Sequence, residues 1–233
     1  MTRSAVLSRS YEGASLHLAP APVLEERRAT GLFTIRTYDA DIAPYQALYS
    51  PTEALMRFAA DHPATEIRTV RNLLVAKGVA FLYTCATGAG VNPGTTAPVT
   101  NNANNYLTAL TAGIGVGDGG GVVPTAASSD TDLTGTTNVF YTACVGAPTI
   151  NGNVLTATAA ISAAQANFVV NEIIFGNFAT SSTYVQGLGQ TQTAKISATP
   201  GSAAYSLISH KGQALGTKSA GQTWTITYTI TIS

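Results

Sequence analysis

The segment from Thr223 to Ile232 alternates strictly between threonine and larger apolar side chains. The larger side chains are Trp224, Ile226, Tyr228, Ile230 and Ile232, and each is preceded by a threonine. Successive side chains of a β-strand point to opposite faces, so the pattern predicts a strand with one face in a core. The threonine face would meet water or a polar neighbour.

Further strand-like runs precede this segment, and each is bounded by turn-forming residues. They cover residues 106–116, 138–145, 153–162, 169–175 and 203–210. Asn151-Gly152 is the strongest hairpin signal in the chain and predicts a type I′ turn. Six or more short strands after a small helical segment predict a mainly β fold, an antiparallel β-sandwich of the jelly-roll or immunoglobulin-like kind.

Two helices are predicted ahead of these strands. Ser50 suits an N-cap, Pro51 the first helical position and Glu53 a capping box, and Pro63 ends the helix. A second helix is expected from about Val70 to Thr84. The expected apolar face of the first helix consists of Leu55, Phe58 and Ala59.

The first 48 residues are predicted to form an extended N-terminal arm, because they show no sustained period and lack the apolar mass for a core. The chain then divides into the arm (1–48), a helical segment (49–86) and a β-sandwich domain (87–233). Apolar side chains of the arm need burial, and a partner's surface is a natural place for them. The residues expected to bind a partner are Leu16, Leu18, Leu24, Arg27, Arg28, Phe33, Ile35, Arg36 and Tyr38.

Charge is concentrated in the first third of the chain. All eight arginines and eight of the twelve acidic residues lie at or before Arg71, whereas residues 72–233 carry four lysines and four acids. A body so poor in charge cannot hold its neighbours apart by electrostatic repulsion, which suits it to an assembly. The net charge of zero argues against binding nucleic acid. No run approaches the roughly 18 apolar residues of a membrane span, and no secretory signal is recognisable.

Two segments, one rich in glycine and one in aspartate, have the residue types of a binding site. Residues Gly115 to Gly120 match G-x-G-x-x-G, but no helix can begin convincingly after them, so a turn is expected rather than a dinucleotide site. Asp118, Asp130 and Asp132 share a loop but lack the spacing of a calcium site, so they are expected to be solvated.

The remaining reactive residues show no catalytic pattern. The three histidines, His17, His62 and His210, are isolated in sequence. Glu172 is expected to pair with Lys195 or Lys211 rather than to act as a catalytic acid. Cys85 and Cys144 lack metal spacing and are expected to be buried free thiols, with one disulfide as the alternative. The sequence therefore predicts no enzyme, no cofactor and no metal.

Six short motifs follow one another in a distinctive order, at residues 72–78, 114–117, 124–133, 171–175, 207–211 and 223–231. In the order and texture of these motifs, the chain from about residue 70 to 233 resembles structural proteins of tailed bacteriophages. The chain departs from the family pattern in its extra glycines at 119–121. The resemblance implies a virion component, such as a capsid decoration protein, a head or tail fibre or a collar part, and it names no catalytic residues.

The leading hypothesis is an auxiliary capsid protein that decorates or cements the shell. It would be made in the bacterial cytoplasm and located in the virion. Its partners would be the major capsid protein or another virion protein, and copies of itself, but neither nucleic acid nor a membrane. The alternatives are a tail, collar or fibre protein, and a receptor- or glycan-binding module that uses loops 87–105 and 117–131.

Overall fold

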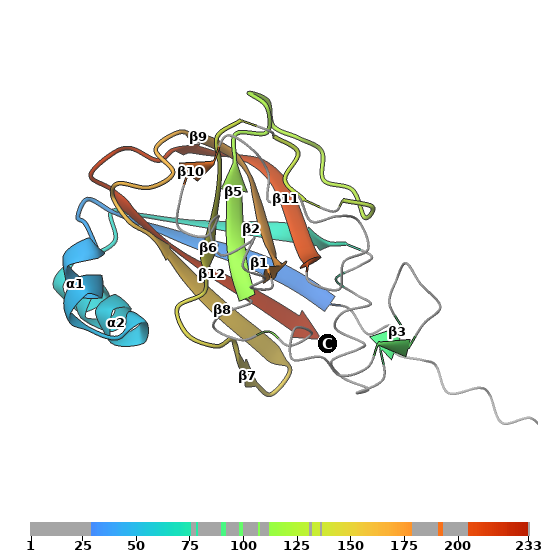
Figure 1. The fold of residues 1–233 in the computed structure, drawn as a ribbon, viewed down its shortest axis with the longest axis horizontal. Coiled ribbons are helices and arrows are strands. Elements are labelled where there is room, and N and C mark those ends of the chain that lie inside the picture. Colours follow the sequence, from blue (N-terminus) through green and yellow to red (C-terminus); the bar gives the residue numbers. More distant parts are fainter. Residues whose placement is uncertain are drawn as a thin grey trace, which may run out of the picture.

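The computed structural model describes residues 29–75, 112–130, 132–135, 137–178 and 205–232, with short pieces at 78, 90–91, 98–99, 107 and 191–192. These residues form two antiparallel sheets packed together, with two helices at one end (Figure 1). The predicted mainly β class and the antiparallel sandwich are therefore confirmed.

The elements follow one another along the chain as a strand, two helices and then strands. The helices are α1 (Ala43–Leu48) and α2 (Pro51–Asp61). The strands are β1 (Ala29–Tyr38), β2 (Glu66–Leu74), β3 (Gly90–Val91), β4 (Pro98–Val99), β5 (Ala112–Gly117), β6 (Val139–Ala143), β7 (Thr149–Asn151), β8 (Val154–Ile161), β9 (Val169–Phe178), β10 (Thr191–Gln192), β11 (Tyr205–Thr217) and β12 (Thr223–Ile232). Strands β3 and β4 pair only with each other.

Strand β2 belongs to both large sheets. Most of its length pairs with β1, in a sheet of order β2-β1-β12-β8-β7. Its last two residues, Leu73 and Leu74, pair with β11 instead, in a sheet of order β10-β6-β5-β9-β11-β2. On the other side, Cys144 after β6 forms a bridge with Ala159 of β8. The two sheets are therefore joined along both sides of the core.

The core between the sheets contains apolar side chains from both of them. Phe33 of β1 and Tyr228 of β12 come from one sheet, with ring centroids 4.7 Å apart. Phe175 of β9 comes from the other sheet, and its ring centroid lies 4.4 Å from that of Tyr228. All three rings are buried, so they fix the spacing of the sheets by direct contact.

The terminal strand β12 spans the predicted residues, and its apolar face is buried except for Ile232. The threonine face was expected to meet water or a polar neighbour, but Thr223 and Thr225 are buried. The helical segment accounts for this burial. Ala160, which pairs with Thr225, packs in one cluster with Phe58 of α2, and the Ile42 amide donates a hydrogen bond to Thr223 Oγ1.

The prediction of an extended arm is wrong for residues 29–48, which are part of the sandwich. Strand β1 pairs with β12 along its whole length and with β2 on its other side. Phe33 and Ile35 are buried between the sheets, and Tyr38 packs on Phe58, so these three side chains serve the fold and not a partner. Apolar residues of β1 do not alternate strictly, since Leu32 and Tyr38 break the period of two, and the pairing with β12 decides the structure of this segment.

The second predicted helix is wrong for its first residues, 70–74, which lie in a strand. Glu66–Leu74 is strand β2, and Val70 faces the core opposite Phe33 of β1. Pairing with β1 and burial between the sheets override the local helical preference of this short segment. In the rest of the predicted span the structure describes Val75, which is in neither helix nor strand, and Gly78, which is helical.

The first predicted helix is confirmed as α2, with Ser50 at the N-cap and Pro51 in the first turn. The capping box is wrong: within the described residues Ser50 makes no side-chain cap, and Glu53 pairs with Arg57. The buried face also differs from the prediction. Ala54 and Phe58 are buried, Leu55 is half-buried and Ala59 is exposed.

The β7–β8 hairpin forms where it was predicted, but its turn lies one residue later. Asn151 pairs with Val154, so Gly152 and Asn153 are the two central residues. Gly152 has a φ of 59° and Asn153 is not in the left-handed region. Positive φ at the first central position only is the pattern of a type II′ turn, not of the expected type I′ turn.

The other predicted strands are present with shifted ends. Strands β6, β8 and β9 correspond to the runs at 138–145, 153–162 and 169–175. Strand β5 covers the end of the run at 106–116, most of whose earlier residues lie outside the described chain, and β11 continues beyond 210 to Thr217. In the part of the chain that the structure describes, neither helix has the length and apolarity needed to cross a membrane.

Candidate functional site

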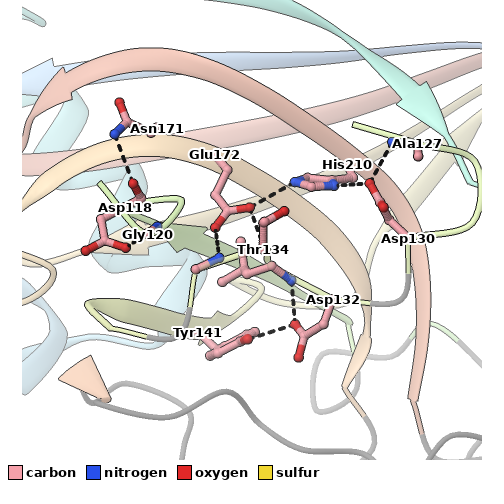
Figure 2. A network of polar contacts seen from close by, with 12 residues as sticks. Asp118, Gly120, Ala127, Asp130, Asp132, Thr134, Tyr141, Asn171, Glu172 and His210 are labelled. Atoms are coloured by element: carbon pink, nitrogen blue, oxygen red, sulfur yellow. Dashed lines mark hydrogen bonds and ion pairs between the residues drawn. The ribbon is translucent and has the colours of Figure 1, made fainter. Parts of the chain in front are cut away.

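A connected group of polar residues lies where the loop after β5 meets strands β9 and β11 (Figure 2). Glu172 comes from β9, His210 from the neighbouring strand β11, and Asp130 from the loop. Glu172 and His210 are buried, and the Asp130 side chain is 22% exposed. We refer to these three residues as the Asp130–His210–Glu172 cluster.

The imidazole of His210 lies between two carboxylates. Its Nδ1 is 2.6 Å from Asp130 Oδ2, and its Nε2 is 3.1 Å from Glu172 Oε2. An ionised carboxylate can only accept hydrogen bonds, so both ring nitrogens must carry a proton to satisfy both contacts. The geometry therefore favours the imidazolium form of His210.

The surroundings shift the pKa values of His210 and Glu172 in opposite directions. Burial by itself lowers the pKa of His210, but hydrogen bonds and charges from Glu172 and Asp130 outweigh it, and the net pKa is raised. Burial raises the pKa of Glu172, but the bond to His210 and two backbone hydrogen bonds outweigh it, and the net pKa is lowered. Both shifts stabilise the charged forms of the pair.

Backbone amides complete the coordination of Glu172. The Thr134 amide donates to Oε2 at 2.7 Å, and the Gly135 amide donates to Oε1 at 2.8 Å. A buried carboxylate is tolerated only when its oxygens are paired in this way. Glu172 therefore binds both the end of the loop, through the two amides, and the His210 side chain.

The start of the loop is fixed by Asp118. Its carboxylate accepts hydrogen bonds from the Gly120 amide and from the Asn138 side chain, both at 2.9 Å. Its backbone carbonyl accepts another from the side chain of Asn171 on β9, at 2.9 Å. Gly119, Gly120 and Gly121 all have positive φ, which only glycine adopts without strain. The glycine-rich motif thus forms a turn, as predicted.

The middle of the loop crosses strand β11. A Cβ atom on Gly212 would collide with the Pro124 carbonyl oxygen, so the loop backbone lies directly against β11 there. Beyond it, Asp130 Oδ2 also accepts the Ala127 amide at 2.7 Å, and Asp132 accepts hydrogen bonds from the Leu133 amide and the Tyr141 hydroxyl. The expectation that the loop aspartates are merely solvated is therefore wrong.

A second buried charge lies at the opposite end of β11. The Lys218 side chain is buried, and its Nζ donates to Asn167 Oδ1 at 3.2 Å. Burial lowers the pKa of Lys218 to about 8, and the charge of Asp41 opposes that shift. Asp41 itself accepts the amides of Ala43 and Ala163, both at 3.1 Å, so Lys218 lies where three loops meet.

The structure corrects the sequence-based view of the histidines and acids. His210 is not isolated, and the partner of Glu172 is His210 rather than Lys211; Lys195 lies outside the described residues. A signal was present in the sequence, because a lone ionisable residue inside an apolar strand needs a buried partner. Cys144 is a buried free thiol, as predicted, and burial raises its pKa to about 12. Cys85 lies outside the described residues.

Most of the residues expected to bind a partner lie outside the described chain: Leu16, Leu18, Leu24, Arg27 and Arg28. The other four are on β1, where only Arg36 is not part of the buried core. Arg36 is half-buried. Its role toward a partner stays a prediction.

The arrangement of the cluster is suited to holding the loop. His210 and Glu172 have no exposed surface, so a substrate in solution cannot reach them in this conformation. Within the described residues, no group of three or more histidine, cysteine or acidic side chains is placed to hold a metal ion. The chemistry that the cluster provides is therefore a buried ionic contact between a loop and two strands.

Comparison of the chain with protein-family models, with curated protein sequences and with solved structures gives no match.

Proposed function

We propose that the chain is a structural component of a bacteriophage virion, an auxiliary capsid protein that decorates or cements the shell. The proposal starts from the resemblance of residues 70–233 to tailed-phage structural proteins. It is supported by the way in which the described part of the sandwich uses its charged groups.

The observation that carries the proposal is that charged groups of the sandwich are engaged in internal contacts. Of the eight charged residues after Arg71, five form hydrogen bonds within the sandwich. They are Asp118, Asp130, Asp132, Glu172 and Lys218. Glu172 and Lys218 are buried and the three aspartates are half-buried, so these residues add less charge to the described surface than their number indicates. A surface with little charge favours packing against other subunits, because it provides little electrostatic repulsion between them.

The segment proposed to fasten the protein to the shell is shorter than the arm predicted from sequence. Because β1 begins at Ala29 and belongs to the core, we assign the fastening to residues 1–28. This segment contains five of the nine residues expected to bind a partner: Leu16, Leu18, Leu24, Arg27 and Arg28. Burial of its apolar residues against the partner would supply binding affinity, and its charged residues would fix the alignment of the segment on the partner's surface.

The first test is to measure where and how often the chain occurs in particles. Quantitative mass spectrometry of virions purified from cells that produce the chain should give on the order of hundreds of copies per particle, as expected for a shell protein. About a dozen copies or fewer would place it in a tail, collar or fibre. Absence from every purified particle would refute a virion role.

The second test separates the fastening from the sandwich. Particles made without the chain are mixed with purified full-length protein or with a variant that lacks residues 1–28, and bound protein is measured after pelleting. We expect the full-length protein to pellet with particles and the truncated variant to remain in solution. A variant with Arg27→Ala and Arg28→Ala is the matched control for charge alone, and it should bind more weakly but still bind. Full binding by the truncated variant would refute the assignment of residues 1–28.

A further inference from the structure

The Asp130–His210–Glu172 cluster joins the loop after β5 to the sheet at two places. At one end, Asp130 contacts His210 Nδ1 and also accepts the Ala127 amide. At the other end, Glu172 contacts His210 Nε2 and accepts the amides of Thr134 and Gly135. Figure 2 shows the imidazole between the two carboxylates. The His210 ring therefore connects two points at which the loop is attached to the sheet. Asp130 and the Ala127 amide form one, and Glu172 with the amides of Thr134 and Gly135 forms the other.

We propose that this cluster is a two-ended, pH-sensitive latch, which releases loop residues 127–130 in alkaline solution and residues 134–135 in acid. The alkaline release depends on a proton lost from His210, and the acid release on a proton added to Glu172. In alkali, residues 127–130 should therefore open while residues 134–135 stay attached, and the strands beneath them should remain paired.

The alkaline release follows from the loss of one proton from His210. A neutral imidazole has a single N–H, so it can donate to one carboxylate only, and its other nitrogen would place a lone pair against an oxygen of the second. Glu172 has no exposed surface and is held by two amides, whereas Asp130 is 22% exposed and can turn toward water. The remaining proton should stay on Nε2, and the contact with Asp130 should open.

The acid release follows from the full use of the Glu172 oxygens as acceptors. Oε2 accepts from His210 and Thr134, and Oε1 accepts from Gly135. A proton added to either oxygen would face an N–H donor rather than an acceptor, so at least one of these contacts must break. The loop amides are the more mobile partners, because His210 is fixed within β11.

The charged groups around His210 support this assignment. Glu172 faces it from β9 and Asp130 from the loop, while β2 places the uncharged Leu73 opposite it in register. The other loop acids are engaged elsewhere, Asp118 with Asn138 and Asp132 with Tyr141. Lys211 follows His210 on β11, and strand alternation directs it to the opposite face.

The shifts at the two groups set the direction of each transition. The pKa of His210 is raised, so the alkaline end opens only above the ordinary histidine range. The pKa of Glu172 is lowered, so the acid end opens only below the ordinary range of a glutamate. The latch should be closed between these two limits.

The test is an NMR titration of the full chain labelled with ¹³C and ¹⁵N. Carbon-detected signals of Ala127, Thr134 and Gly135 are followed from acid to alkali, because amide protons exchange too fast in alkali. We expect Ala127 to shift and lose order on the alkaline side while Thr134 and Gly135 stay unchanged, and Thr134 and Gly135 to lose order on the acid side. A response of Thr134 and Gly135 together with Ala127 on the alkaline side, or the absence of either transition, would refute the latch.

Two variants and one direct measurement sharpen the result. His210→Gln should abolish the alkaline transition at Ala127, whereas His62→Gln, which alters a histidine at the end of α2, should leave it intact. An alkaline transition that persists in His210→Gln would contradict the proposal. If His210→Gln does not fold, the ring ¹⁵N shifts of His210 in the unaltered protein decide the matter, because a neutral ring at pH 7 would refute a closed ionic latch.

Discussion

Gly117 of β5 lies directly opposite Glu172 of β9, and a Cβ atom on Gly117 would be 2.8 Å from Glu172 Oε1. The second glycine of the motif that resembles a dinucleotide-binding sequence thus makes room for a buried carboxylate. The same strand contains a comparable glycine without this role. A Cβ atom on Gly115 would meet Ile174 and Tyr141 instead.

Gly117→Ala should therefore destabilise the protein by about 1–3 kcal/mol at pH 7 through overpacking and displacement of Glu172. The cost should shrink in acid, because the wild-type protein then also loses the ionic contacts of Glu172. Gly115→Ala is the matched control, and its cost should not vary with pH. Urea unfolding of both variants at pH 3 to 7 measures the difference, and equal pH dependence would contradict this role of Gly117.

Glu172→Gln should cost about 3–5 kcal/mol at pH 7, because it removes one of the two carboxylate partners of a buried imidazolium and turns an amide NH₂ toward a backbone N–H. The lowered pKa of Glu172 means that its contribution is complete above the ordinary glutamate pKa and is lost as pH falls through the lowered value. The raised pKa of His210 means that its contribution is complete below the ordinary histidine pKa and is lost as pH rises through the raised value.

The stability difference between wild type and Glu172→Gln should accordingly be greatest between these two limits. Free energies of unfolding from urea titrations across the pH range test it. Asp39→Asn, which alters an exposed acid bonded to Gln222, is the control and should change stability by less than about 0.5 kcal/mol. A loss of stability in Glu172→Gln that does not vary with pH would show that Glu172 does not stabilise the fold through its charge.

Lys218→Met should be neutral or stabilising at pH 7, by about 1 kcal/mol, because it removes a buried charge that has only one hydrogen-bond partner in the described structure. The free energy of unfolding of the wild-type protein should then rise relative to that of the variant between about pH 8 and the ordinary lysine pKa. Over that interval the unfolded state binds the proton and the folded state has released it. Lys211→Met, at a half-buried position on β11, is the control. The idea fails if both variants show the same pH profile.

Phe58→Ala should lower stability by about 3–4 kcal/mol, because Phe58 fastens α2 to the sandwich through Tyr38 and Tyr45. Met56→Ala on the same helix removes a side chain that is 68% exposed, so its effect should stay within about 0.5 kcal/mol. Thermal unfolding followed by circular dichroism compares them. Similar losses for both variants would contradict the packing described for α2.

Cys144 should not react with iodoacetamide in the folded protein, because it is buried and its thiol pKa is raised to about 12. A Cys85→Ser variant leaves Cys144 as the one remaining cysteine. Intact-mass measurements should show labelling in denaturant only. Rapid labelling without denaturant would mean that the core around Cys144 opens readily.

Sequence periodicity is sufficient to predict a strand where polar and apolar residues alternate along its whole length. β12 was predicted with its residue bounds, since threonine and apolar residues alternate from Thr223 to Ile232. β2 was mistaken for the start of a helix, because Val70 and the leucines that follow do not alternate clearly. Its structure comes from pairing with β1 and β11, which a local pattern does not contain.

The candidate site was beyond local sequence patterns for a related reason. Asp130, Glu172 and His210 are separated by about forty residues at each step. The pairing of β9 with β11 brings Glu172 and His210 together, and the loop that crosses β11 adds Asp130. In the sequence, each of these ionisable residues stands alone within an apolar strand or a polar loop. Such a residue indicates that a partner exists but does not identify it.

The pairing of β1 with β12 has a consequence for synthesis of the protein. Tyr38 pairs with Thr223 and Ala29 with Ile232, so one of the first strands to leave the ribosome must wait for the last described strand before its central sheet can close. During that interval the edge of β1 that pairs with β12 has no partner, and the aromatic side chain of Phe33 in β1 is not yet covered by Tyr228. Nascent chains should therefore depend on chaperones until translation reaches β12.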